Sequence, residues 1–144
     1  KYRKKKGHEV FERKVIKLPS HITALNQLKK LGEQKLWQNG LTKEYHTEIT
    51  EIIRKYFEER FNLFALELTT AEALELLKDR KEAEPILDIT NNFLTNADLV
   101  KFAKFFPMPS VNEEMMQQAY SIIKKTIPQE LKVVENLNKE ETNV

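Results

Sequence analysis

The sequence contains no cysteine, only three glycines among 144 residues, and no run of 18 or more apolar residues. Without cysteine there is no disulfide framework, no thiolate metal site and no cysteine nucleophile. The isolated glycines supply neither a phosphate-binding loop nor a dinucleotide-binding fingerprint, and the G-x-S-x-G motif of many hydrolases is missing too. No stretch is apolar for long enough to cross a bilayer. The sequence therefore lacks the commonest catalytic and cofactor-binding motifs.

The residues that are abundant indicate a helical domain. Hydrophobic residues make up 40% of the chain and charged residues 32%, with five prolines. This composition is typical neither of a β-sandwich nor of a disordered chain. At this length one domain buries about 68–70% of the surface of its unfolded chain. We therefore expect a single folded body without disulfides.

Apolar side chains recur at helical spacing in the segment 41–61. These positions are Tyr45, Ile49, Ile52, Ile53, Tyr56, Phe57 and Phe61. They form one stripe of an α-helix, while charged residues take the opposite side. Such a wide stripe needs partners on more than one side, which favours surrounding helices over a sheet. The sequence predicts an all-α, compact bundle of five or six helices around a central helix at about 42–61.

Capping signals divide the chain into its other helices. Ser20 is interpreted as the N-cap of a helix that ends near Gly40, and Thr42 as the cap of the central helix. Four later starts are predicted. Their signals are a T-x-x-E box at 69–72, Pro85 in the first turn of a helix at 84–94, the polar residues 95–98 and an S-x-x-E box at 110–113. The last of these helices is expected to end before Pro128.

Charge is distributed unevenly along the chain and suggests three parts. Residues 1–17 carry eight Lys or Arg against two Glu, a net charge of +6, and the remainder carries −4. We predict a basic juxtamembrane linker at 1–19, a helical domain at 20–128, and a short C-terminal helix with a frayed tail at 129–144. The basic N-terminal segment and the acidic remainder of the chain are therefore interpreted as separate regions.

The basic start resembles the collar that follows the cytoplasmic end of a transmembrane helix. Its cations are Lys1, Arg3, Lys4, Lys5 and Lys6, with Tyr2 among them. Lys and Arg accumulate on the cytoplasmic side of membranes, and aromatic residues accumulate at the interface. We interpret these residues as membrane-proximal, with the spanning segment preceding Lys1. A solvated basic tail is the alternative.

The sequence offers little to a catalyst. His8, His21 and His46 form no H-E-x-x-H motif and are interpreted as surface histidines. Adjacent carboxylates such as Glu58 and Glu59 point to different faces of a helix. We therefore predict no enzyme, no cofactor, no metal site and no small-molecule substrate.

The alternative function is that of a DNA-binding regulator. The segment T-T-A-E-A-L-E-L-L after a loop is similar to the second helix of a helix-turn-helix. A recognition helix carries Arg, Lys, Asn or Gln toward the major groove, whereas this segment carries Glu72 and Glu75. The negative body opposes phosphate binding as well. The preferred prediction is therefore that no nucleic acid binds.

Two groups of residues have more than one interpretation. Arg54, Tyr56 and Arg60 could form an ion-pair group with Glu67 and Glu72 that fixes the third helix against the second. The aromatic cluster is Phe102, Phe105 and Phe106, beside Met108. We favour burial of this cluster in the core, together with Leu99 and Ala103. The alternative is an exposed apolar edge that binds a partner.

Several motifs together resemble one bacterial family. They are L-P-S-H-I-T-A-L, then Y-H-T-E-I-T-E-I-I-R-K-Y-F-E-E-R-F, then E-L-T-T-A-E, then A-D-L-V-K-F-A-K-F-F-P. The pattern resembles the cytosolic tail of single-pass membrane proteins of the MoxR and Bat (aerotolerance) gene clusters, and it covers residues 18–128. The family's biochemical role is not established, so the resemblance assigns no catalytic residue.

The resemblance implies a location and a set of partners. It implies a cytoplasmic domain at the bacterial inner membrane, working with a MoxR-type AAA ATPase or with von Willebrand A domain proteins. We expect an adaptor or regulatory function through protein–protein interaction. The D-x-V-K-F-A-K helix projects charge beside the aromatic cluster, so the expected partner-binding residues are Asp98, Lys101, Phe102, Lys104 and Phe105.

Overall fold

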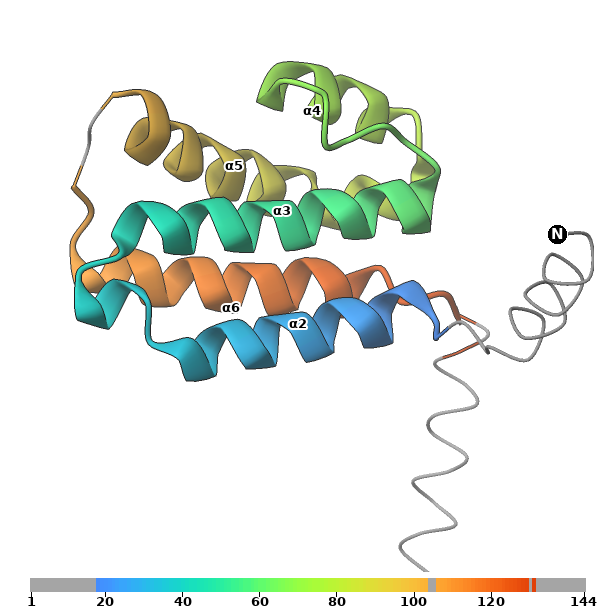
Figure 1. Cartoon of the computed structure of the whole chain (residues 1–144). Helices are drawn as coiled ribbons and strands as arrows, with labels where there is room; N and C mark the ends of the chain where they lie inside the picture. The colour runs from blue at the N-terminus through green and yellow to red at the C-terminus, as the bar shows by residue number, and fades with distance from the viewer. Residues whose placement is uncertain (1–17, 104–105, 130, 132–144) are drawn as a thin grey trace, which may run out of the picture.

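The computed structural model describes residues 18–103, 106–129 and 131. Across these residues it contains five α-helices and no β-strand, which confirms the predicted all-α bundle (Figure 1). The α-helices are α2 (Ser20–Gln34), α3 (Thr42–Phe61), α4 (Thr70–Lys78), α5 (Leu87–Phe102) and α6 (Pro109–Lys125). Two short 3₁₀ helices, η1 (Trp37–Asn39) and η2 (Lys81–Ile86), join neighbouring α-helices.

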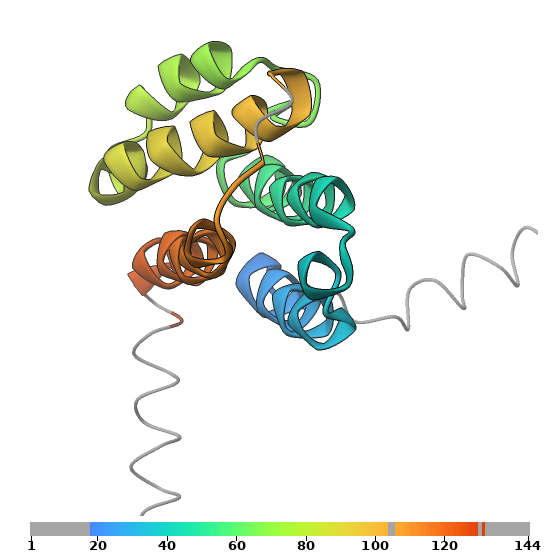
Figure 2. The ribbon, with the colours of Figure 1, turned by 90° about the vertical axis from the view of Figure 1, so that its left-hand side faces the viewer.

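Helix α3 is the centre of the bundle. It contacts α2, α5 and α6, and Figure 2 shows α3 between α2 and α5, with α4 beyond α5. Its predicted stripe is buried: Ile49, Ile53 and Phe57 are fully enclosed, and Tyr45 and Tyr56 nearly so. Burial of one such side chain contributes about 1.5–3 kcal/mol. The amphipathic pattern of the sequence therefore placed the main core element correctly.

Helix α4 lies outside the ring of helices around α3. It packs mainly on α5 and η2, and its apolar side is narrow, with Ala73 and Leu77 buried. The predicted capping box is present: the Thr69 hydroxyl accepts from the Glu72 amide, and the Glu72 carboxylate accepts from the Thr69 amide. Residues 62–69, called the connection below, run from the end of α3 to this cap.

The first two helices begin one residue away from the predicted caps. The N-cap of α2 is Pro19 and that of α3 is Leu41, so Ser20 and Thr42 are the first helical residues and cap nothing. Helix α2 also ends earlier than predicted, because Lys35 adopts a left-handed conformation with φ 52°. The left-handed conformation breaks the α-helical hydrogen-bond pattern, and the chain continues through η1.

One predicted start in the second half is wrong and one is displaced by two residues, while the helix predicted at 84–94 begins at Leu87 as α5. Helix α5 runs without a break through 95–98, because Thr95 and Asn96 bond to the side chains of Asn91 and Asn92 one turn earlier and cap nothing. Helix α6 begins at Pro109, where a missing amide proton costs no helical hydrogen bond. The S-x-x-E segment therefore lies inside a helix that is already formed.

The described members of the aromatic cluster are not in the core, which corrects the favoured prediction for them. Phe102 is 73% exposed and Phe106 is 79% exposed. Leu99 and Met108 are also exposed, as is Ala103, whereas Val100 near the end of α5 and Pro107 are buried. The core contact of α5 comes instead from Phe93, Leu94 and Ala97, one and two turns earlier. Lys104 and Phe105 lie outside the described residues.

Other sequence predictions also concern residues that the structure does not describe. These are the basic collar Lys1, Arg3, Lys4, Lys5 and Lys6, His8, and nearly all of the segment 129–144. Among the described helices, none is both long and apolar enough to cross a membrane. The juxtamembrane linker and the C-terminal tail remain predictions.

Candidate functional site

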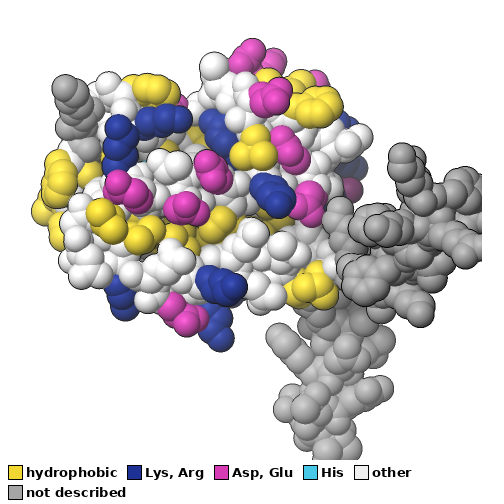
Figure 3. Space-filling model, in the orientation of Figure 1, with side chains coloured by type: hydrophobic (Ala, Val, Ile, Leu, Met, Phe, Trp, Pro, Cys, Tyr) yellow, Lys and Arg dark blue, Asp and Glu magenta, His cyan; other side chains and the backbone are white. Residues whose placement is uncertain are grey.

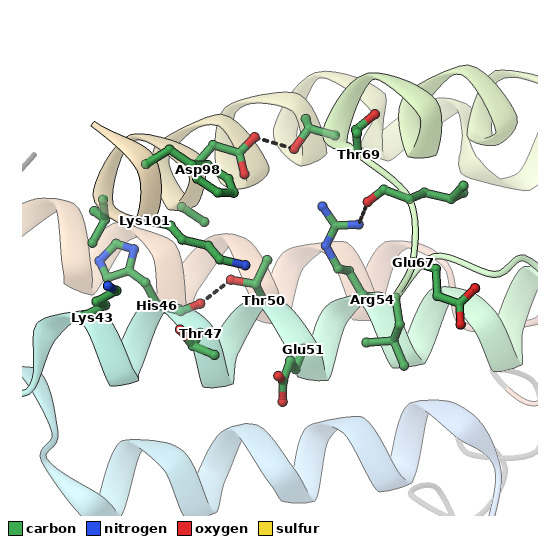
Figure 4. Close-up of a pocket in the computed structure, with 16 residues that line it drawn as sticks. Lys43, His46, Thr47, Thr50, Glu51, Arg54, Glu67, Thr69, Asp98 and Lys101 are labelled. Atoms are coloured by element: carbon green, nitrogen blue, oxygen red, sulfur yellow. Dashed lines mark hydrogen bonds between the residues drawn. The ribbon is translucent and has the colours of Figure 1, made fainter. Parts of the chain in front are cut away.

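A cleft lies between α3 and the outer pair of helices, α4 and α5 (Figure 4). Its volume is about 480 Å³, which is within the usual range of ligand and peptide pockets. Helix α3 forms one wall, the end of α5 forms the other, and the connection with the start of α4 closes one end. We call this space the α3–α5 cleft.

The α3 wall carries polar side chains at helical spacing. Lys43, Thr47, Thr50 and Arg54 all line the cleft and follow one another at intervals of four, three and four residues. They lie on the face of α3 that its apolar stripe leaves free. The Thr50 hydroxyl is bonded to the carbonyl of His46, so it stays close to its own helix. A cationic side chain therefore stands at each end of this wall.

Arg54 is the anchor of the connection. Its guanidinium donates to the carbonyl oxygens of Ala65 and Leu68, each over 2.6 Å. Partial burial lowers the pKa of Arg54, and the carboxylate of Asp98 opposes that shift. The residue remains charged, since even a lowered arginine pKa stays far above neutral pH. Arg54 thus shapes the closed end of the cleft by fixing its backbone.

The ion-pair group predicted around Arg54 does not form. Glu67 and Glu72 form no ion pair or hydrogen bond with either arginine, and Glu72 closes the cap of α4 instead. Arg60 pairs with Glu82 of η2 and donates to the Thr126 carbonyl at the end of α6, 2.7 Å away. Arginine is well suited to carbonyl oxygens because it carries five donors in a fixed plane. Both arginines bind backbone carbonyls outside their own helix. A pattern of side chains in the sequence does not reveal such partners.

Asp98 already has a partner inside the protein. Its carboxylate accepts a hydrogen bond of 2.6 Å from the Thr70 hydroxyl, which ties α5 to the first residue of α4. The side chain is half-buried on the cleft wall. This predicted partner-binding residue therefore helps to hold the cleft in shape.

Lys101 and Phe102 form the rim at the end of α5. The Lys101 ammonium lies 5.2 Å from the centre of the Phe102 ring, a cation–π distance, and Figure 4 shows Lys101 extending from α5 toward α3. Within the described part of the chain, neither Lys101 nor Lys43 is in an ion pair. Figure 3 shows Lys or Arg side chains along this face where α5 and α3 approach, and hydrophobic side chains at the left-hand edge.

A buried polar network supports the cleft from behind. His46 and Tyr45 are each 2% exposed, so the predicted surface position of His46 is wrong. The Nε2 atom of His46 lies 2.7 Å from the Asn112 Oδ1, and the Tyr45 hydroxyl donates to the Asn112 carbonyl over 2.8 Å. These bonds join the start of α3 to the start of α6. His21 is buried too, on α2.

The protonation states of this network follow from burial. Burial lowers the pKa of His46, and the bond to Asn112 only partly opposes the shift. His46 is therefore neutral near pH 7, with the proton on Nε2 because Asn112 Oδ1 is an acceptor. Nδ1 is then an acceptor that is shielded from solvent and has no partner among the described residues. Burial also raises the pKa of Tyr45, which stays a neutral donor.

The free groups of the cleft are cationic, aromatic and apolar side chains. Across the described residues, no group of three or more His, Asp or Glu side chains could hold a metal ion. The wall hydroxyl of Thr50 and the carboxylate of Asp98 are each engaged within the protein. What remains open is a pair of lysines, an exposed aromatic ring and an apolar lining that includes Leu66 and Val100.

The sequence located only one wall of this site. Of the five predicted partner-binding residues, the structure places Asp98, Lys101 and Phe102 in the cleft. The missed residues are Lys43, Thr47, Thr50 and Leu66, which come from α3 and the connection. A polar stripe at 43, 47, 50 and 54 was visible in the sequence. Its position opposite the end of α5 depends on tertiary packing.

Comparison of the chain with models of known protein families, with curated proteins and with solved structures found no match. The structure itself defines the described part of the chain as an all-α bundle with a cleft between α3 and α5.

Proposed function

We propose that this chain is a protein-interaction domain, of adaptor or regulatory type, and that a partner binds at the α3–α5 cleft. One observation carries the proposal: Phe102 is 73% exposed at the rim of a cleft of about 480 Å³. Aromatic residues are enriched in protein interfaces, where they bury a large area at low entropic cost. An exposed phenylalanine beside a hollow is a suitable anchor for a partner.

The neighbouring apolar residues support the same proposal. Leu66 lines the cleft from the connection and is 45% exposed, while Leu99, Phe106 and Met108 are exposed around the end of α5. Single exposed apolar residues are common, but several around one corner are typical of an interaction surface. Lys43 and Lys101 supply the polar rim that such surfaces usually have.

The location and partners follow from the family resemblance. We propose that the domain works at the cytoplasmic side of the bacterial inner membrane, with the basic residues of 1–6 near the headgroups. A MoxR-type AAA ATPase or a von Willebrand A domain protein is the proposed partner. The proposal includes neither catalysis, nor a cofactor, nor nucleic-acid binding. Helix α4 exposes Glu72 and Glu75, which a phosphate backbone would repel.

Site-specific photo-crosslinking in the native host tests this proposal. A benzophenone amino acid is placed at Phe102, and in a matched control at Phe64, which is 78% exposed but does not line the cleft. We expect an AAA ATPase or a von Willebrand A domain protein to be crosslinked from Phe102 and identified by mass spectrometry, with much less from Phe64. The same adducts from both positions, none from Phe102, or nucleic acid alone would contradict it.

A further inference from the structure

We infer that the α3–α5 cleft recognises an acidic segment of a partner protein, in which a carboxylate lies next to an apolar side chain. The inference rests on the proposed function and adds the chemistry of the partner. It starts from the charges that line the cleft. Lys43 of α3 and Lys101 of α5 both line the cleft, Figure 4 shows Lys101 extending toward Thr50, and Arg54 lies further along the α3 wall.

The carboxylates around the cleft do not neutralise these two lysines. Asp98 is bonded to Thr70, and its carboxylate also interacts with the charge of Arg54 at the closed end. Glu51 points away from the cleft toward α2, and Glu67 lies beyond Arg54 on the connection (Figure 4). The lysine end therefore presents positive charge to a ligand, without a counter-ion among the described residues.

The buried histidine adds no charge to the cleft. His46 lines the cleft beside Lys43 and is 2% exposed. Its Nδ1 atom is shielded from solvent, so a ligand in the cleft does not reach it. Recognition of a charged group on the ligand therefore depends on the two lysines.

The apolar lining sets the second requirement. The Phe102 ring lies 5.2 Å from the Lys101 ammonium, so an anion on Lys101 has an exposed aromatic surface beside it. Ala97 and Val100 continue this surface into the cleft, and Leu66 faces it from the connection. A segment that pairs Asp or Glu with Leu, Phe or a similar residue matches both features.

The dimensions fit a short extended segment. Lys43 and Arg54 are eleven residues apart on α3, which corresponds to about 16 Å along the helix axis. An extended chain advances about 3.3 Å per residue, so about five residues span the wall. The closed end at Arg54 is occupied by the carbonyls of the connection. The acidic residue is therefore expected at the lysine end.

Titration of the ¹⁵N-labelled 144-residue chain, followed by NMR, tests the inference. The probe is the blocked heptapeptide Gly-Glu-Glu-Leu-Phe-Glu-Gly, and its matched control replaces each Glu by Gln. We expect the acidic peptide to shift amide signals of 43–54, 66–70 and 97–102, and the Gln peptide to bind much more weakly. Added salt should raise the Kd of the acidic peptide, because the contacts are between exposed charges.

Paired lysine variants locate the binding. Lys43→Gln with Lys101→Gln should raise the Kd about tenfold, from about threefold for each exposed charge pair. The control, Lys29→Gln with Lys30→Gln, removes the same charge from exposed residues of α2 and should leave the Kd nearly unchanged. No shifts at millimolar peptide, equal binding of the two peptides, or equal weakening by both double variants would overturn the inference. If the cleft binds a partner protein but not an acidic segment, Phe102 should still crosslink to that partner although the peptide experiments fail.

Discussion

His46 shows how one side chain can make stability depend on pH. Its ring is buried and neutral, with Nε2 held by Asn112 at 2.7 Å, and burial lowers its pKa below the ordinary value of 6.5. In the unfolded chain the same ring takes up a proton near the ordinary value. As the pH falls through 6.5, the unfolded state therefore binds more protons than the folded state. Stability is full above this pH and decreases below it.

We predict that urea unfolding will report this loss. The free energy of unfolding should fall between pH 7.5 and pH 5.5, and His46→Gln should reduce the size of that fall although it weakens the protein at pH 7.5. The quantity compared is the change in the free energy of unfolding with pH in each protein. A constant destabilisation of the variant does not alter this change. An unchanged slope in the variant would show that His46 is not the titrating group.

Arg54 contributes strongly to the order of one element, the connection. This segment has no regular secondary structure, and Arg54 bonds to its carbonyls at Ala65 and Leu68, while Leu63 and Ala65 are buried. Two further bonds, each of 3.1 Å, are from the Leu66 amide to the Glu58 carboxylate and from the Glu67 amide to the Phe64 carbonyl. Since the connection forms one end of the cleft, its order also sets the shape of the site.

We predict that Arg54→Ala will loosen the connection more than it affects the core. Removal of the guanidinium leaves two carbonyls without a donor, and the loss should be about 1–3 kcal/mol for a buried group. Hydrogen exchange at the amides of Leu66 and Glu67 should accelerate, while exchange at the core residue Ile53 follows global stability alone. Lys55→Ala, an exposed change one residue away, is the control and should leave the rates near wild type. Unchanged protection in Arg54→Ala would contradict the anchoring role.

At the scale of the whole molecule, stability depends on the contacts of α3 with α2, α5 and α6. Phe57 is fully buried where these helices meet, whereas Phe64, a ring of the same size, is 78% exposed on the connection. Truncation of each residue therefore shows how burial changes the free energy of unfolding when the residue type is the same. Because one core joins all four helices, unfolding should occur as a single transition.

We predict a large difference between the two truncations. Phe57→Ala should cost about 3–5 kcal/mol, since it removes transfer free energy and leaves a cavity. Phe64→Ala should stay within about 0.5 kcal/mol of the unchanged chain. Thermal and urea unfolding measure both values. Similar losses in the two variants, or separate transitions for parts of the chain, would contradict a single core centred on α3.

The family resemblance and the function drawn from it remain proposals, since the comparisons found no match. What the sequence by itself determined is the class and the centre of the fold. The 3.6-residue pattern of 45–61 gave the buried face of α3, and the reciprocal bonds of Thr69 and Glu72 gave the start of α4. Both depend on neighbours within a few residues, which sequence spacing specifies directly.

Only the tertiary structure decided where the aromatic cluster and the polar residues lie. Phe102 looks like a core residue by composition, yet the core contact of α5 is made one and two turns earlier, so Phe102 is left at the rim. His46 looks like a surface residue, yet Asn112, distant in sequence, supplies the partner that permits its burial. Burial depends on which helices pack together, and the chemistry of a single side chain does not determine that packing. The cleft between α3 and α5 exists for the same reason.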